Sequence, residues 1–105
     1  MKNTFRTEYG KIEDPDLKRF VDVLKLNNYS IPLMIRYMLT LKKVMQVTGK
    51  PLKDATKQDI ERVVSELIKM KPNTRDTELK QIKVFYRWLR TGSLERGQPY
   101  PPEVA

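Results

Sequence analysis

Apolar side chains repeat at the helical spacing in four segments of this chain, and each segment lies between residues that start or stop helices. The four segments are residues 14–28, 30–49, 56–72 and 73–92. No run of alternating apolar residues is long enough to predict a strand. The pattern predicts an all-α bundle of four helices, each of about 12–18 residues, joined by short loops.

The predicted helix boundaries follow from residue types with known positional preferences. Asp14 precedes a proline, which is the order of an N-cap and a first helical residue. Ser30 is the expected N-cap of the second helix, and Gly49 is its expected left-handed terminator. Thr56 and Asp59 approximate a capping box at the start of the third helix.

The regions outside the four segments differ in character. Residues 1–13 mix polar groups with isolated aromatic side chains and show no sustained period, so we expect a flexible N-terminal arm. Residues 14–92 are the size of one small domain. Residues 93–105 end in a proline-rich stretch, 98–102, that is typical of an extended linker.

The chain contains neither histidine nor cysteine. Imidazole acid–base chemistry, Ser-His-Asp catalysis and metal sites built on histidine or thiolate ligands therefore cannot arise within it. The carboxylates lie mainly at predicted helix starts, where the helix dipole favours them, and the four glycines are scattered rather than gathered in a phosphate-binding loop. We expect no catalytic residue, no metal and no cofactor, and a protein that is not an enzyme.

The formal net charge is +8, from 21 basic and 13 acidic side chains. Such an excess favours a polyanionic partner such as nucleic acid, although it also serves solubility alone. No apolar run approaches the roughly 20 residues that a membrane span requires, and the N-terminus lacks an apolar signal core. We therefore expect a soluble, cytoplasmic protein with no membrane partner.

The segment 73–89 separates into two faces when it is drawn as a helix. An arc of roughly 120° is apolar and suits burial; it carries Leu79, Ile82, Phe85, Tyr86 and Leu89. A separate arc is basic and holds no acidic residue; it carries Lys80, Lys83, Arg87 and Arg90. These cations are interpreted as contacts to nucleic-acid phosphates, or as a solvated face, since lysine and arginine are good helix formers.

Two further groups extend this hypothesis. A weaker basic stripe on the second helix consists of Arg36, Thr40 and Lys43. At the start of the fourth helix, free backbone N–H groups near Asn73, Thr74 and Arg75 suit a phosphate, although Asn73 or Thr74 also serves as an ordinary cap.

Two residues of the last predicted helix do not fit either face. Trp88 and Val84 lie off its apolar arc, and the sequence leaves open whether they pack against the C-terminal tail or against a partner.

Two stretches together resemble a known family. The first is Thr74 followed by Leu79-Lys80-Gln81-Ile82-Lys83-Val84-Phe85-Tyr86-Arg87-Trp88-Leu89. The second runs from Tyr29-Ser30 through Tyr37 and Leu41 to Gly49-Lys50-Pro51-Leu52 and Ala55-Thr56-Lys57-Gln58-Asp59-Ile60. In order and spacing they resemble the N-terminal core-binding domain of tyrosine recombinases, the phage-integrase and Xer-type enzymes.

This resemblance has two departures. Met34 stands where a threonine is frequent in the family, and Lys83 replaces an arginine, which keeps the charge but loses the bidentate fork.

The resemblance implies a SAM-like orthogonal four-helix bundle that holds duplex DNA with its second and fourth helices. It implies a role in DNA integration or recombination, with catalysis in a C-terminal domain that this chain does not include. It further implies a monomeric isolated domain within a recombinase that is tetrameric on DNA. The alternative is a small helical protein-interaction module, with Trp88 and Val84 as an exposed apolar contact.

Overall fold

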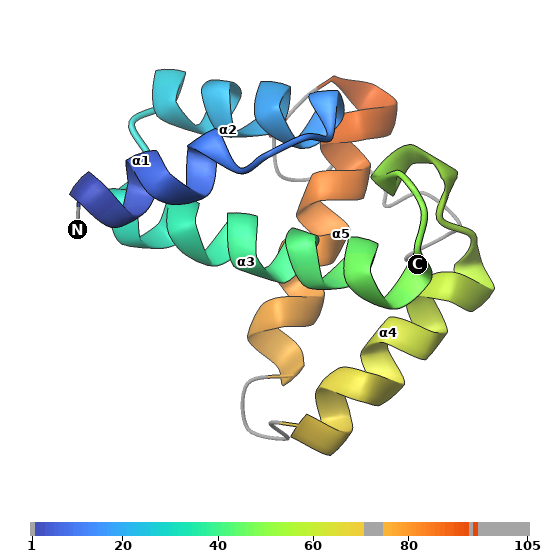
Figure 1. Cartoon of the computed structure of the whole chain (residues 1–105). Helices are drawn as coiled ribbons and strands as arrows, with labels where there is room; N and C mark the ends of the chain where they lie inside the picture. Colours follow the sequence, from blue (N-terminus) through green and yellow to red (C-terminus); the bar gives the residue numbers. More distant parts are fainter. Residues whose placement is uncertain (1, 71–74, 93, 95–105) are drawn as a thin grey trace.

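The computed structural model describes residues 2–70, 75–92 and 94 (Figure 1). The regular secondary structure of this part of the chain is all helical, without a strand, which confirms the predicted all-α class. Its elements in chain order are α1 (Lys2–Gly10), α2 (Pro15–Leu26), α3 (Ile31–Thr48), the short 3-10 helix η1 (Leu52–Asp54), α4 (Lys57–Met70) and α5 (Arg75–Thr91). The four predicted helices correspond to α2, α3, α4 and α5.

The N-terminal segment differs from the predicted arm, because residues 2–10 form helix α1, which packs against α3. Phe5 and Tyr9 lie one turn apart with their rings stacked at 5.9 Å, and both are partly buried against the core. The Tyr9 hydroxyl also donates a hydrogen bond of 2.8 Å to Asp22 on α2, and this bond raises the pKa of Tyr9. Two aromatic side chains are too few to make a visible period, so the sequence pattern missed this helix.

The helix boundaries confirm the predicted caps. Asp14 Oδ1 accepts hydrogen bonds from the backbone N–H groups at the start of α2, and Ser30 Oγ accepts one from the start of α3. Gly49 ends α3 at a φ of 67°, a left-handed conformation that glycine adopts without strain. Thr56 and Asp59 bond reciprocally across the first turn of α4, as a capping box does.

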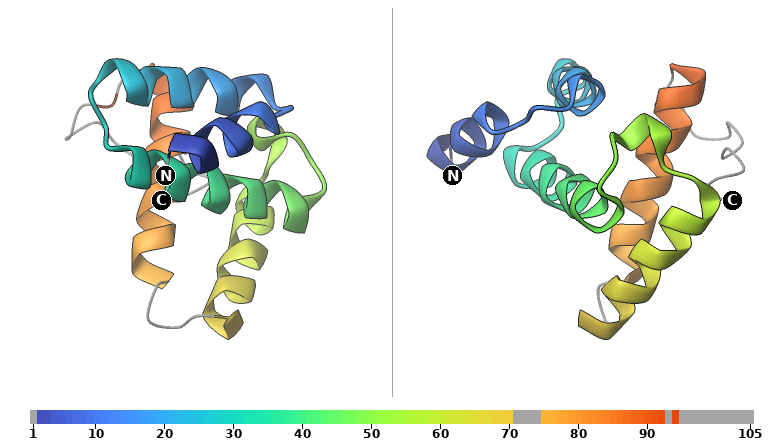
Figure 2. Two further views of the ribbon diagram at one scale, coloured as in Figure 1. Left: turned by 60° about the vertical axis from the view of Figure 1, so that its left-hand side comes forward. Right: turned by 45° about the vertical axis from the view of Figure 1, so that its right-hand side comes forward.

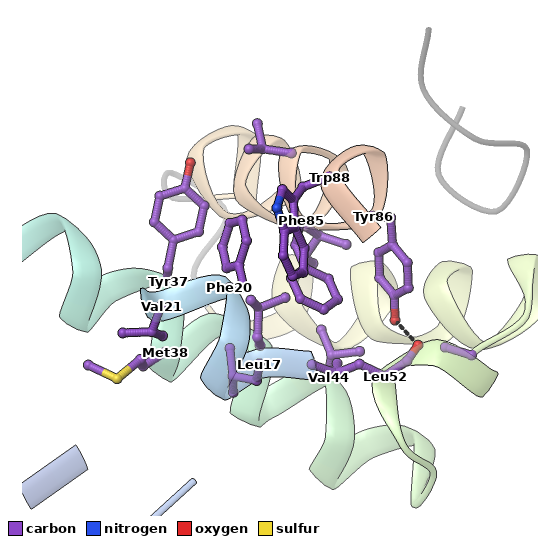
Figure 3. Close-up of a cluster of buried hydrophobic side chains, with 14 of the residues drawn as sticks. Leu17, Phe20, Val21, Tyr37, Met38, Val44, Leu52, Phe85, Tyr86 and Trp88 are labelled. Atoms are coloured by element: carbon purple, nitrogen blue, oxygen red, sulfur yellow. Dashed lines mark hydrogen bonds between the residues drawn. The ribbon is translucent and has the colours of Figure 1, made fainter. Parts of the chain in front are cut away.

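The core is centred on an aromatic cluster contributed by three helices (Figure 3). Phe20 of α2 lies 5.1 Å from Phe85 and 5.0 Å from Trp88 of α5, and 5.5 Å from Tyr37 of α3, measured between ring centroids. Trp88 and Val84 are only 5% and 8% exposed. The open question about these two residues is therefore resolved, because both belong to the core.

The buried Leu52 peptide joins η1 to two distant helices. Its N–H donates to Asp14 Oδ2 at 3.1 Å, and its carbonyl accepts a hydrogen bond of 2.7 Å from the Tyr86 hydroxyl (Figure 3). Asp14 thus uses one carboxylate oxygen to cap α2 and the other to bind η1. The loop after α3 is held to α2 and α5 by these two bonds.

The helices are arranged so that α3 crosses in front of α5 and lies below α2 in Figure 1. The N-terminal half of α5 and all of α4 extend past α3 on the side away from α2 (Figures 1 and 2). Of the predicted linker 93–105, only Leu94 is described, and it is partly buried against the core. No helix in the described part of the chain is long and apolar enough to cross a membrane.

We predict that Asp14→Ala lowers the free energy of unfolding by about 2–4 kcal/mol, because it removes a helix cap and leaves the buried Leu52 N–H without an acceptor. Urea denaturation measures this loss. Asp16→Ala is the matched control in the same helical turn, where an exposed pair with Arg19 contributes less than about 1 kcal/mol. Equal losses in the two variants would contradict the bridging role of Asp14.

The capping box predicts how stability depends on pH. The Lys50 ammonium, 2.8 Å from the Asp59 carboxylate, and the Thr56 N–H lower the pKa of Asp59 to about 2 from its ordinary 3.8. Because the pKa is lower in the folded state, this stabilisation is complete above the unfolded value of 3.8 and is lost as the pH falls toward 2.

We therefore expect the denaturation midpoint to fall between pH 4 and pH 2, and to fall less steeply in Asp59→Asn. Lys50→Met, which removes the principal cause of the shift, is expected to reduce the same slope. An unchanged slope in both variants would exclude Asp59 as its source.

Candidate nucleic-acid interface

Helix α3 carries uncompensated positive charge. Its 18 residues include Arg36, Lys42 and Lys43 and no acidic residue. The side chains of Arg36 and Lys43 make no hydrogen bond or ion pair with any residue in the described part of the chain. Arg36 is exposed and Lys43 is partly exposed, so both remain available to an anionic ligand.

Lys42 has different surroundings from Arg36 and Lys43. It lines a cavity of about 280 Å³ whose other charged residues are Glu8, Lys11, Glu13 and Asp14, so its surroundings are of mixed charge. The basic surface of α3 is therefore carried mainly by Arg36 and Lys43.

Thr40 does not have the position that was predicted for it. It is 6% exposed, and its hydroxyl donates a hydrogen bond of 2.8 Å to Gln81 Oε1 on α5. A hydroxyl engaged in this buried bond is not available to DNA, so the prediction of a contact at Thr40 is corrected to a structural role. The partner, Gln81, was missed because a single polar residue between the two predicted faces of α5 carries no signal of its own.

The basic residues of α5 divide into exposed and buried groups. Lys80 is exposed and makes no ion pair with a described residue. Lys83 is partly buried and interacts with another group of the protein. Arg90 is exposed, and its guanidinium donates to the Lys53 carbonyl at 3.3 Å. The predicted stripe is interrupted at Arg87, which is only 7% exposed and makes contacts within the protein.

The burial of Arg87 has a physical reason. Helix α5 packs against α2, α3 and α4, and all its residues from Gln81 to Trp88 except Lys83 are buried. A helix contacted on several sides does not have the single exposed arc that the sequence pattern assumed. The prediction that Arg87 contacts DNA is therefore wrong, because Arg87 is a buried residue.

The predicted phosphate site at the start of the fourth helix is only partly covered by the structure. Asn73 and Thr74 lie outside the described residues. Arg75 is the first residue of α5, but its side chain is outside the described set as well.

The Thr40–Gln81 hydrogen bond sets the relative positions of the exposed cations. Arg36 and Lys43 lie about one turn before and after Thr40 on α3, and Lys80 directly precedes Gln81 on α5. The bond joins α3 to α5, which pack against each other. Cations from two helices are thereby held in a fixed relation to each other.

The described residues contain neither histidine nor cysteine. Among them, no group of three or more acidic side chains is placed to hold a metal ion. A second cavity, of about 690 Å³, lies between α1, the end of α2 and the start of α3 and mixes aromatic with charged side chains. No protein-family model, curated protein or solved structure matches this chain.

We predict that Thr40→Val lowers the free energy of unfolding by about 1–3 kcal/mol, because the buried Gln81 amide loses its partner. The double variant Thr40→Val/Gln81→Leu is expected to be more stable than the sum of the two single changes implies, by at least about 0.5 kcal/mol. Chemical denaturation of the four proteins of this cycle measures the coupling. Strict additivity would show that the hydrogen bond does not link the helices energetically.

Proposed function

We propose that this chain binds double-stranded DNA through α3 and the N-terminal half of α5. The observation that carries the proposal is the set of three exposed or partly exposed cations, Arg36, Lys43 and Lys80, whose side chains have no ion-pair partner among the described residues. They lie on two helices that are joined by a buried hydrogen bond, and α3 contains no acidic residue. Such cations favour phosphates, because binding them releases condensed counterions.

These contacts would mainly position the protein on the duplex. Lysine and arginine bound to phosphates fix the orientation of a protein on the duplex without reading its sequence. The isolated chain is expected to bind with a dissociation constant of about 10⁻⁴–10⁻⁶ M, the range of non-specific contacts at physiological salt. Raising the salt concentration is expected to weaken this binding.

We further propose that the fold is a SAM-like bundle of the kind found in the core-binding domain of tyrosine recombinases. Support comes from the positions of the residues that carry the resemblance. Phe85, Tyr86 and Trp88 lie in the core, and Leu52 of the second motif accepts the Tyr86 hydrogen bond. The resemblance is thus made of residues that hold the helices together, and α1 is an addition to the four helices it implies.

A place in DNA integration or recombination follows from that resemblance. Without histidine, this chain does not itself contain the catalytic set that the family uses, so strand cleavage would belong to another domain. The chain would act by holding the duplex.

The alternative, a protein-interaction module, was based on Trp88 and Val84 as an exposed apolar contact. Both side chains are buried in the core, so this basis is absent. DNA binding is therefore the function that the described residues support best.

We predict that the triple variant Arg36→Glu/Lys43→Glu/Lys80→Glu lowers duplex affinity at least tenfold and reduces the salt slope by about one unit for each phosphate that is no longer bound. Fluorescence anisotropy with a labelled duplex at several salt concentrations measures both quantities. Lys25→Glu, on the exposed surface of α2, is the charge-matched control for each of the three single reversals and is expected to have a small effect. Arg87 is left unchanged, because reversing a buried charge would disturb folding.

A triple variant that binds DNA as tightly as the parent, with the same salt slope, would rule out this interface. Circular dichroism and thermal unfolding of each variant verify that the comparison is between folded proteins.

A further inference from the structure

Leu39 is an exposed apolar side chain in the middle of the basic surface of α3. It is 48% exposed, whereas the core-facing residues of the same helix are nearly inaccessible to solvent. Ile35, one turn earlier, is partly buried against the core, so Leu39 is the more outward of the two. Leu39 is not part of the core formed by the described residues.

Leu39 is flanked by cations along the helix. Arg36 lies three residues before it and Lys43 four residues after it, spacings that place side chains next to each other on one helical face. The two flanking cations are about 10 Å apart along the helix axis, at 1.5 Å per residue. An apolar side chain thus lies between two positive charges on one surface.

The major groove of DNA has a matching arrangement. It is about 12 Å wide, admits an α-helix, and has a phosphate backbone along each edge. Among the bases, thymine presents an apolar group there, its 5-methyl, with which apolar side chains make contact. An acidic protein surface would satisfy the cations, but Lys80 on the neighbouring helix, which has no ion-pair partner among the described residues, extends the positive charge beyond α3 and favours the longer polyanion.

We infer that Leu39 contacts thymine 5-methyl groups when α3 binds in the major groove, so that this side chain gives the domain a preference for thymine. The inference rests on the proposed DNA binding and adds a base-reading residue to a surface that otherwise contacts phosphates. The phosphate contacts of Arg36 and Lys43 hold the helix in the groove, and Leu39 faces the base edges between them.

The experiment compares two duplexes that differ only in the methyl group. One is a duplex of about two helical turns, roughly 20 base pairs, made only of A·T pairs, and the other has deoxyuridine in place of every thymidine. Burying a methyl-sized group stabilises a complex by an amount that corresponds to about a fourfold change in dissociation constant. We expect the parent chain to bind the thymine duplex about fourfold more tightly than the uracil duplex.

Variants of the two exposed leucines test whether Leu39 is the source of the thymine preference. Leu39→Ala is expected to bring the ratio of the two dissociation constants close to one. Leu26→Ala, at an 82% exposed leucine on α2, is the matched control and is expected to keep the parent ratio. Leu39→Lys is expected to bind both duplexes more tightly while also losing the preference, which separates base contact from phosphate contact.

Other outcomes distinguish failure of the Leu39 inference from failure of the proposed DNA binding. Salt-dependent binding with a parent ratio of one would overturn the role of Leu39 and leave the proposed DNA binding intact. Absence of binding to either duplex at low salt would overturn the proposed function together with the inference. A preference that persists in Leu39→Ala would assign it to other residues or to DNA shape. Self-association abolished by Leu39→Ala, with equal affinity for both duplexes, would assign the side chain to a protein contact instead.

Discussion

The peptide group of Leu52 is the point on which the arrangement of this bundle depends. Its N–H is bound by Asp14 and its carbonyl by Tyr86, residues 38 and 34 positions away in the chain. Both polar groups lie in the interior, where an unpaired donor or acceptor is costly, so the two bonds stabilise one position of η1 relative to α2 and α5. Because η1 joins α3 to α4, those two bonds also constrain the direction in which the chain leaves α3.

The candidate DNA surface depends on how α3 packs against α5. The aromatic cluster around Phe20 packs the helices together, and its Phe20–Phe85 pair is edge to face with an interplanar angle of 88°. The Thr40–Gln81 hydrogen bond is directional, and it holds the exposed face of α3 in one orientation relative to α5. Positive charge on two separate helices thereby becomes part of one surface.

Local features of this fold could be predicted from sequence, and features set by packing could not. The caps at Asp14, Ser30 and Thr56 were predictable because each depends on residues within one helical turn. Helix α1 was missed because it is stabilised by contacts with α2 and α3 rather than by its own pattern. The burial of Arg87 was missed for a related reason: periodicity identifies an apolar face but not how many other helices pack around it.

The burial of Arg87 also affects how long a complex with DNA would last. It leaves Arg36, Lys43 and Lys80 as the anchors of the proposed interface, none of which has an ion-pair partner among the described residues, and three phosphate contacts correspond to a salt slope of only about −2.7. So few contacts allow rapid dissociation when the domain acts alone. A tether to a second DNA-binding unit would compensate, because a short flexible linker holds the released domain at an effective concentration of about 1 mM beside its site. Under the proposed function, such a sparse positive surface would suit a domain that releases and rebinds one duplex repeatedly while a linked unit keeps it nearby.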